Sequence, residues 1–123
     1  MKTYKPTQIL ISATQESMGA LFADVLMDAG FNSKIVGRHE NLLHELHTGS
    51  YSVLILTNNA FGANEVVELI PHINVIDPNV KIIVLSGWNQ ENFSERILAA
   101  GATHFFPLPI ELDILVDCVK KII

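Results

Sequence analysis

The stretch Lys81-Ile82-Ile83-Val84-Leu85-Ser86-Gly87 is a continuous apolar run, rich in β-branched residues, that ends in a small hydroxyl residue and a glycine. Such a run is typical of a strand that is buried on both faces, which indicates a parallel sheet covered by helices. Three further segments have the same character: Gln8–Ser12, Tyr51–Thr57 and Ala102–Pro107. Because the carboxyl ends of the strands form the binding site in open α/β sheets, the residues that follow each run are the candidate site.

Helical segments separate the strands, because apolar residues recur there at steps of three and four. The helices are expected over Glu16–Ala29, Glu40–Thr48, Asn64–Ile73, from Asn89 to Ala100 and over Glu111–Ile122, with a weak strand at Ser33–Val36. Pro71 is expected to kink or shorten the third helix, and Asn89 to cap the fourth. Gly30, Gly49 and Gly101 are expected to end helices. Strands that alternate with single helices predict a doubly wound α/β fold, (βα)5, with five parallel strands and helices on both faces.

Length and composition limit the classes of function. The 123 residues suffice for one domain, which we expect to span residues 1–123, and 49% hydrophobic residues suit a sheet covered on both sides. A formal charge of −5 argues against a nonspecific grip on nucleic acid or an anionic membrane surface. No run reaches the roughly 18 apolar residues of a membrane span. The polar start of the chain and its single cysteine favour a cytoplasmic protein without an internal disulfide.

The residues after the strands lack the groups that catalysis or metal binding needs. Ser12, Ala13, Thr14 and Gln15 follow the first strand, and the third strand runs out into Thr57, Asn58 and Asn59. A magnesium site requires carboxylate oxygens, and Glu16, the nearest acid, is expected in the first helical turn. No histidine or aspartate is placed to activate Thr57 or Ser86, and no glycine-rich phosphate loop is present. We therefore expect a protein that is not an enzyme and holds no Mg²⁺.

The histidines and the cysteine are expected to be structural. His39 and His44 are five residues apart and face different sides of a helix, whereas His44 and His47 could share a metal ion. No third ligand is in sight, so a solvated helix face is expected. His72 and His104 are interpreted as isolated polar positions, and Cys118 as a small packing residue.

Two aromatic residues near the strand ends have two interpretations. Trp88 follows the fourth strand, and Phe61 lies in the loop after the third. They either cover the site or anchor a partner, or they fold back onto the helices. The sequence leaves both interpretations open.

Short motifs along nearly the whole chain resemble the receiver domains of bacterial response regulators, the signalling modules of two-component systems. The motifs are Ile9-Leu10-Ile11, Ala29-Gly30-Phe31, Tyr51–Leu56, Ile82–Gly87, Ala99–Ala102 and Pro109, in the family's order and spacing. The resemblance implies a flavodoxin-like fold. It also implies a switch hydroxyl at Ser86, a switch aromatic at Phe105 and a cis peptide bond between Leu108 and Pro109.

The departures from the family pattern fall on its phosphorylation site. The acidic pair that holds Mg²⁺ corresponds here to Ala13 and Thr14, the phosphoacceptor aspartate to Thr57 and the lysine to Leu108. The loop that usually reads methionine-proline is Ala60-Phe61. The chain therefore resembles the pseudo-receivers, which work without aspartyl phosphorylation. Fewer like charges in one crevice also predict greater stability without Mg²⁺.

The resemblance implies that the domain acts by protein–protein contact. The face made by the fourth helix, the fifth strand and the fifth helix is expected to bind a partner protein, an output domain or a second copy, around Glu91, Glu95, Phe105 and Asp113. The alternative hypothesis is a small ligand in the emptied crevice. Its contacts would come from Thr14, Thr57, Asn59 and Ser86, with Trp88 as the cover.

Overall fold

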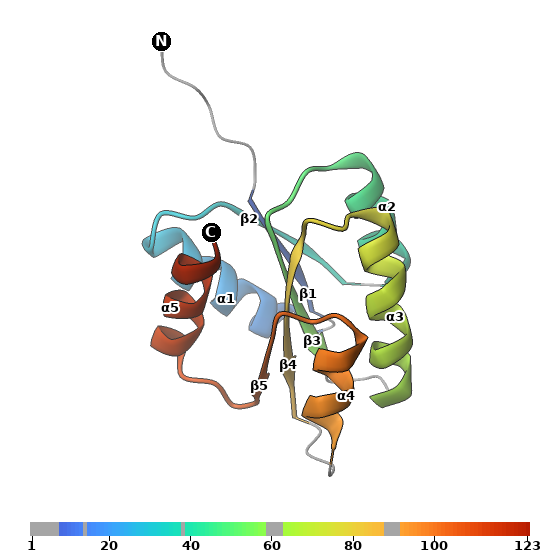
Figure 1. Ribbon diagram of the computed structural model, residues 1–123. Helices are drawn as coiled ribbons and strands as arrows, with labels where there is room; N and C mark the ends of the chain where they lie inside the picture. The colour runs from blue at the N-terminus through green and yellow to red at the C-terminus, as the bar shows by residue number, and fades with distance from the viewer. Residues whose placement is uncertain (1–7, 14, 38, 59–62, 88–91) are drawn as a thin grey trace.

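The computed structural model describes residues 8–13, 15–37, 39–58, 63–87 and 92–123. Five strands alternate with five helices in these residues (Figure 1). In chain order they are β1 (Ile9–Ser12), α1 (Glu16–Asp28), β2 (Ser33–Val36), α2 (His39–Thr48), β3 (Val53–Asn58), α3 (Ala63–Ile76), β4 (Lys81–Ser86), α4 (Phe93–Ala100), β5 (His104–Pro107) and α5 (Leu112–Ile122). The alternation predicted from the apolar runs is confirmed.

All strand pairs are parallel, and the sheet order is β2-β1-β3-β4-β5. Figure 1 shows α1 and α5 on one face of the sheet and α2, α3 and α4 on the other. This is the flavodoxin-like order, in which the chain reverses direction across the sheet between β1 and β3. The predicted fold class is therefore confirmed, and the carboxyl ends of β1 and β3 lie side by side at the point of reversal.

The sheet separates two apolar clusters, because successive side chains of a strand point to opposite faces. Ile9, Val53 and Ile83 belong to the cluster under α1 and α5. Leu10 and Leu54, one position along, belong to the cluster under α2, α3 and α4. All of these side chains are fully buried, which explains why the strands are almost continuously apolar.

Glycines end two helices as expected. Gly30 has a φ of 94°, and the N–H of Phe31 donates to the Leu26 carbonyl at 2.9 Å, which closes α1. Gly101 has a φ of 123° and closes α4 with the equivalent bond from Ala102. A Cβ atom at Gly101 would also collide with the amide of Asn74 on α3, so this glycine lets α4 approach α3 closely.

Two expectations about helix bounds are wrong. α3 does not end at Ile73 but continues to Ile76, so Pro71, which is exposed, does not shorten the helix. α4 begins at Phe93 after Asn92 and not directly after Asn89, which lies outside the described residues. Asn92 has a φ of 68°, a left-handed conformation that asparagine tolerates and that a helix interior excludes.

Glu45 on α2 connects β2 with the start of β3 through two hydrogen bonds. Its carboxylate accepts from Lys34 Nζ at 2.9 Å and from the Tyr51 hydroxyl at 2.8 Å. Both hydrogen bonds lower the pKa of Glu45, and the bond from Lys34 has the larger effect. Burial, as the larger cause, and the hydrogen bond to Glu45 together raise the pKa of Tyr51 to about 12. The folded protein therefore holds the Tyr51 proton more tightly than the unfolded chain, whose tyrosine titrates near 10.0.

We predict that Tyr51→Phe removes part of the alkaline loss of stability. In the native protein the raised pKa of Tyr51 contributes stability below pH 10, and this contribution is lost as the pH rises from about 10 towards 12. The variant should be the less stable protein at pH 7, where the hydrogen bond is missing, and the difference should shrink above pH 10. Urea unfolding between pH 7 and 11.5 measures this. Parallel stability curves for the two proteins would contradict the prediction.

Candidate functional site

Three hydroxyl residues gather at the carboxyl edge of the sheet, the edge formed by the carboxyl ends of the strands. Ser12, Thr57 and Ser86 lie at or near the ends of β1, β3 and β4, which are neighbours in the sheet. They are 4%, 1% and 1% exposed and are the buried polar residues of the described chain. The sequence predicted hydroxyl groups at this edge. Their burial means that they line the interior of the edge and not an open polar crevice.

Thr57 is tied to the neighbouring strand. Its Oγ1 atom donates a hydrogen bond of 2.7 Å to the backbone carbonyl oxygen of Ser12. The bond exists because the fold places β1 directly beside β3, so residues 45 apart in the chain meet at the edge. The proton of this hydroxyl is already donated within the protein, which makes Thr57 a link between strands and a poor nucleophile.

Backbone bonds hold the other strand ends. The N–H of Ala13 donates to the Val36 carbonyl at 3.0 Å, and the N–H of Leu108 donates to the Ser86 carbonyl at 2.8 Å. Ala13 is buried, and Thr14 lies outside the described residues. Glu16 is exposed in the first turn of α1, as expected. The described part of the edge therefore offers backbone and hydroxyl groups but no carboxylate.

These described residues do not fit a magnesium ion. Mg²⁺ prefers carboxylate oxygens in octahedral geometry, and the edge presents the methyl group of Ala13 and an engaged hydroxyl at Thr57. Within the described ranges, no three His, Cys, Asp or Glu side chains are placed to share a metal ion.

Leu108 lies where the resemblance implies a lysine. The side chain is half-buried and packs against the cluster under α1 and α5, together with Phe106 and Ile110. The peptide bond between Leu108 and Pro109 is cis, as the resemblance implied. An apolar side chain at this position extends the core towards the edge and brings no positive charge to it.

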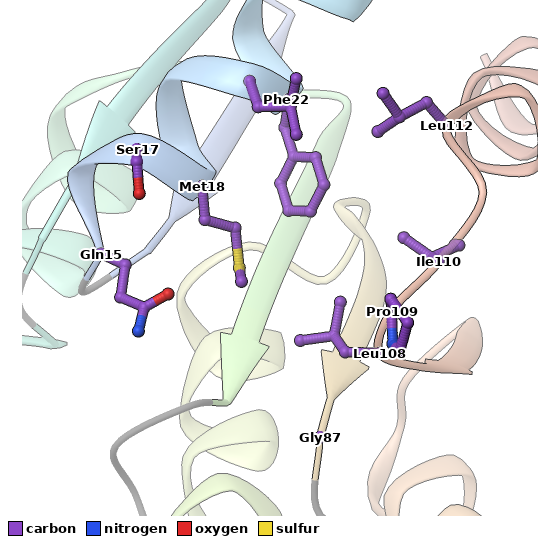
Figure 2. A pocket seen from close by; sticks show the side chains of 10 residues that line it. Gln15, Ser17, Met18, Phe22, Gly87, Leu108, Pro109, Ile110 and Leu112 are labelled. Atoms are coloured by element: carbon purple, nitrogen blue, oxygen red, sulfur yellow. The ribbon is translucent and has the colours of Figure 1, made fainter.

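A groove that the sequence did not predict opens beside this edge, between α1 and the segment after β5 (Figure 2). We call it the α1–α5 groove, and its volume is about 860 Å³. The lining residues are Gln15, Ser17, Met18, Leu21, Phe22, Gly87, Leu108, Pro109, Ile110 and Leu112. Polar groups at the strand ends were the expected site, whereas most of this lining is apolar. The apolar side chains of Leu108 and Ile110, beyond the last strand, were the available signal.

Among the described residues, the histidines and Cys118 belong to no group of three side chains that could hold a metal ion. His44, His47 and His72 are exposed, and the side chain of His39 is outside the described set. Burial raises the pKa of the Cys118 thiol, which is 7% exposed within the core, so the predicted packing role is confirmed. The ring of His104 stacks on Phe106, with ring centroids 6.1 Å apart and an interplanar angle of 2°. Its Nδ1 atom is buried without a hydrogen-bond partner among the described residues.

The proposed contact residues do not all share one face. Phe105 is half-buried and meets Phe93 edge to face, with ring centroids 5.6 Å apart. Glu95 is exposed on α4, and Glu91 lies outside the described residues. The placement of Asp113 on the face of α4, β5 and α5 is wrong, because Asp113 lines a second hollow between α1 and α5, which is separate from the α1–α5 groove. Successive side chains of a helix point about 100° apart around its axis, so the next residue, Ile114, lines a hollow beside β5 instead.

The ligand hypothesis for the crevice is only partly tested. Asn59, Ala60, Phe61 and Trp88 fall outside the described residues, as does Thr14, so the interpretation of Trp88 as a cover stays a prediction. Of the proposed polar contacts, Thr57 is buried and engaged with Ser12.

Solved structures of response regulators share this architecture. A response regulator from Thermotoga maritima aligns with a TM-score of 0.86 and 22% identity, covering 96% of this chain and 98% of that one. A two-component response regulator from Clostridium difficile aligns with a TM-score of 0.86 and 19% identity, covering 95% of each chain. The fold is that of a response-regulator receiver domain.

Sequence relatives support the receiver assignment. The sporulation initiation phosphotransferase F of Bacillus subtilis is 23% identical over 114 residues, which are 93% of this chain and 91% of that protein. The DNA-binding transcriptional regulator NtrC of Azospirillum brasilense is 26% identical over 113 residues. The chain spans only 23% of the length of the NtrC regulators that it matches. No family model matches the chain. Among the described residues, no helix is long and apolar enough to cross a membrane.

We predict that Thr57→Asp destabilises this domain at pH 7. A carboxylate there would be buried and would face the Ser12 carbonyl oxygen without a cation, at a cost of roughly 3 kcal/mol or more. Thr57→Asn is the matched control, because the asparagine side chain has the same shape as that of aspartate but carries no charge. Burial raises the pKa of such an aspartate, so the gap between the two variants should narrow as the pH falls towards 4. Chemical unfolding at pH 4 to 7.5 measures the gap, and a constant or absent difference would contradict the prediction.

Proposed function

We propose that this chain is a cytoplasmic receiver domain that signals through protein contact and works without aspartyl phosphorylation. The observation that carries the proposal is the hydrogen bond from Thr57 Oγ1 to the Ser12 carbonyl oxygen. This bond engages the hydroxyl group of Thr57, the residue that corresponds, by resemblance, to the phosphoacceptor aspartate.

Phosphoryl transfer to an aspartate uses three kinds of group. A carboxylate accepts the phosphoryl group, a metal ion neutralises the charge that develops, and a cation stabilises the product. The corresponding positions are Thr57 for the acceptor, Ala13 with Thr14 for the metal ligands and Leu108 for the cation. With these residues the domain is not an enzyme and uses no Mg²⁺ in its proposed role.

The face made by α4, β5 and α5 is the proposed contact surface. β5 is an edge strand of the sheet, and an edge leaves backbone donors and acceptors available to a partner. Leu98 on α4 is 46% exposed, and Ile114 on α5 is 45% exposed. Between β5 and α5, His104, Phe106 and Ile114 line a hollow of about 320 Å³. Apolar residues of this size at a surface favour protein contact. The partner is an output domain, another protein or a second copy of the chain.

We predict that beryllofluoride or acetyl phosphate with Mg²⁺ leaves the amide NMR spectrum of this domain unchanged. Residue 57 is a threonine, so the protein offers no carboxylate at this position for beryllofluoride to bind or for acetyl phosphate to phosphorylate. A receiver domain that carries the acidic pair and the acceptor aspartate is the positive control, and its spectrum should change under the same conditions. Clear shifts around Thr57 and Ser86 would contradict the proposal.

We predict that Ile114→Glu weakens self-association or partner binding through the contact surface. The new charge would have to be desolvated within an apolar contact, which should lower the affinity about tenfold or more. Val75→Glu is the matched control, because Val75 is 83% exposed on α3, away from this surface. Light scattering over a range of concentrations, with the partner protein when it is known, measures the effect. Equal behaviour of the two variants would place the contact elsewhere.

A further inference from the structure

We propose that the α1–α5 groove binds an uncharged, largely apolar small molecule with one hydrogen-bonding group at its end. This binding site goes beyond the proposed signalling role and does not depend on it. It also differs from the ligand hypothesis drawn from the sequence, because it uses the flank of α1 in place of the buried hydroxyls.

The described lining of the groove is free of charge. Charged residues make up 17% of the chain, which has a formal charge of −5, yet none of the ten described residues that line the groove is charged. A charged ligand would lose its hydration here without gaining a partner of opposite charge. The lining therefore selects for neutral molecules.

The size and polarity of the groove fit a small molecule. Its volume of about 860 Å³ lies within the roughly 300–1,000 Å³ of ligand pockets. Figure 2 shows Gln15 and Ser17 at one end, whereas Ile110 and Leu112 lie at the other. A ligand with an apolar body and one terminal hydroxyl, amide or carbonyl group matches this arrangement. Met18 lies between the two ends, and its flexible thioether can adjust to the shape of the ligand.

The rim of the groove favours a small ligand over a protein surface. Glu16 stands between two lining residues on α1, and Glu111 between two after β5, and both are exposed. Asp24 and Asp113 are exposed further along α1 and α5. The elements that form the groove therefore also carry these four exposed acidic side chains, which we call the acidic rim. This rim repels anionic ligands and a second copy of an acidic chain, but it does not hinder a neutral molecule that fits within the groove.

The test uses the neutral fluorophore N-phenyl-1-naphthylamine and the whole chain. We expect saturable binding of one molecule per chain, and weaker binding of the related anion 1-anilinonaphthalene-8-sulfonate. Leu21→Lys places a charge on the groove, where Leu21 is 49% exposed, and should weaken binding of the neutral probe about tenfold or more. Met27→Lys is the matched control, because Met27 lies on the same helix, is 66% exposed and does not line the groove. It should leave the affinity unchanged.

Methyl NMR of the unaltered protein provides a second measurement that does not rely on a variant. The probe should shift the methyl signals of Met18, Leu108 and Ile110 and leave that of Val75 in place. Unsaturable binding, equal effects of the two lysine variants or preferred binding of the anion would overturn the proposal. Loss of probe binding as the protein concentration rises, with a doubling of mass in light scattering, would show that a second copy covers the groove and would also overturn it.

Discussion

The hydrogen bond between Thr57 Oγ1 and the Ser12 carbonyl oxygen joins the two strands between which the chain reverses direction. At this point of a doubly wound sheet the strand ends separate and leave room for a ligand. Here the side chain of one strand satisfies the backbone of the other. The edge is closed from within, so the chemistry available to the molecule lies on the surfaces around it and not between β1 and β3.

The absence of charged side chains from the described part of the edge is accompanied by an apolar groove beside it. Leu108 brings an apolar side chain to a position where the resemblance implies a lysine, and it lines the α1–α5 groove. Ala13 is buried and carries only a methyl group. The described part of the edge therefore holds no pair of carboxylates that would repel one another. Leu108 therefore forms part of an apolar wall beside the carboxyl edge of the sheet.

The fold could be predicted from the sequence because its signals are local. The apolar runs and the glycines at positions 30 and 101 depend only on near neighbours. The face occupied by Asp113 could not be predicted reliably, because one residue turns a side chain by about 100° around a helix. The groove could not be predicted either, since α1 and the segment after β5 are separated by most of the chain. The bond between Thr57 and Ser12 depends on the strand order, which the sequence left open.

The two apolar clusters lie on opposite sides of the sheet and share no residue. A cavity or an added methyl group in one cluster relaxes against its own helices, with the strand backbones as a barrier. Substitutions in separate clusters therefore add nearly independently in their effect on stability. Substitutions that change the lining of the α1–α5 groove should consequently leave the packing under α2, α3 and α4 nearly unaffected.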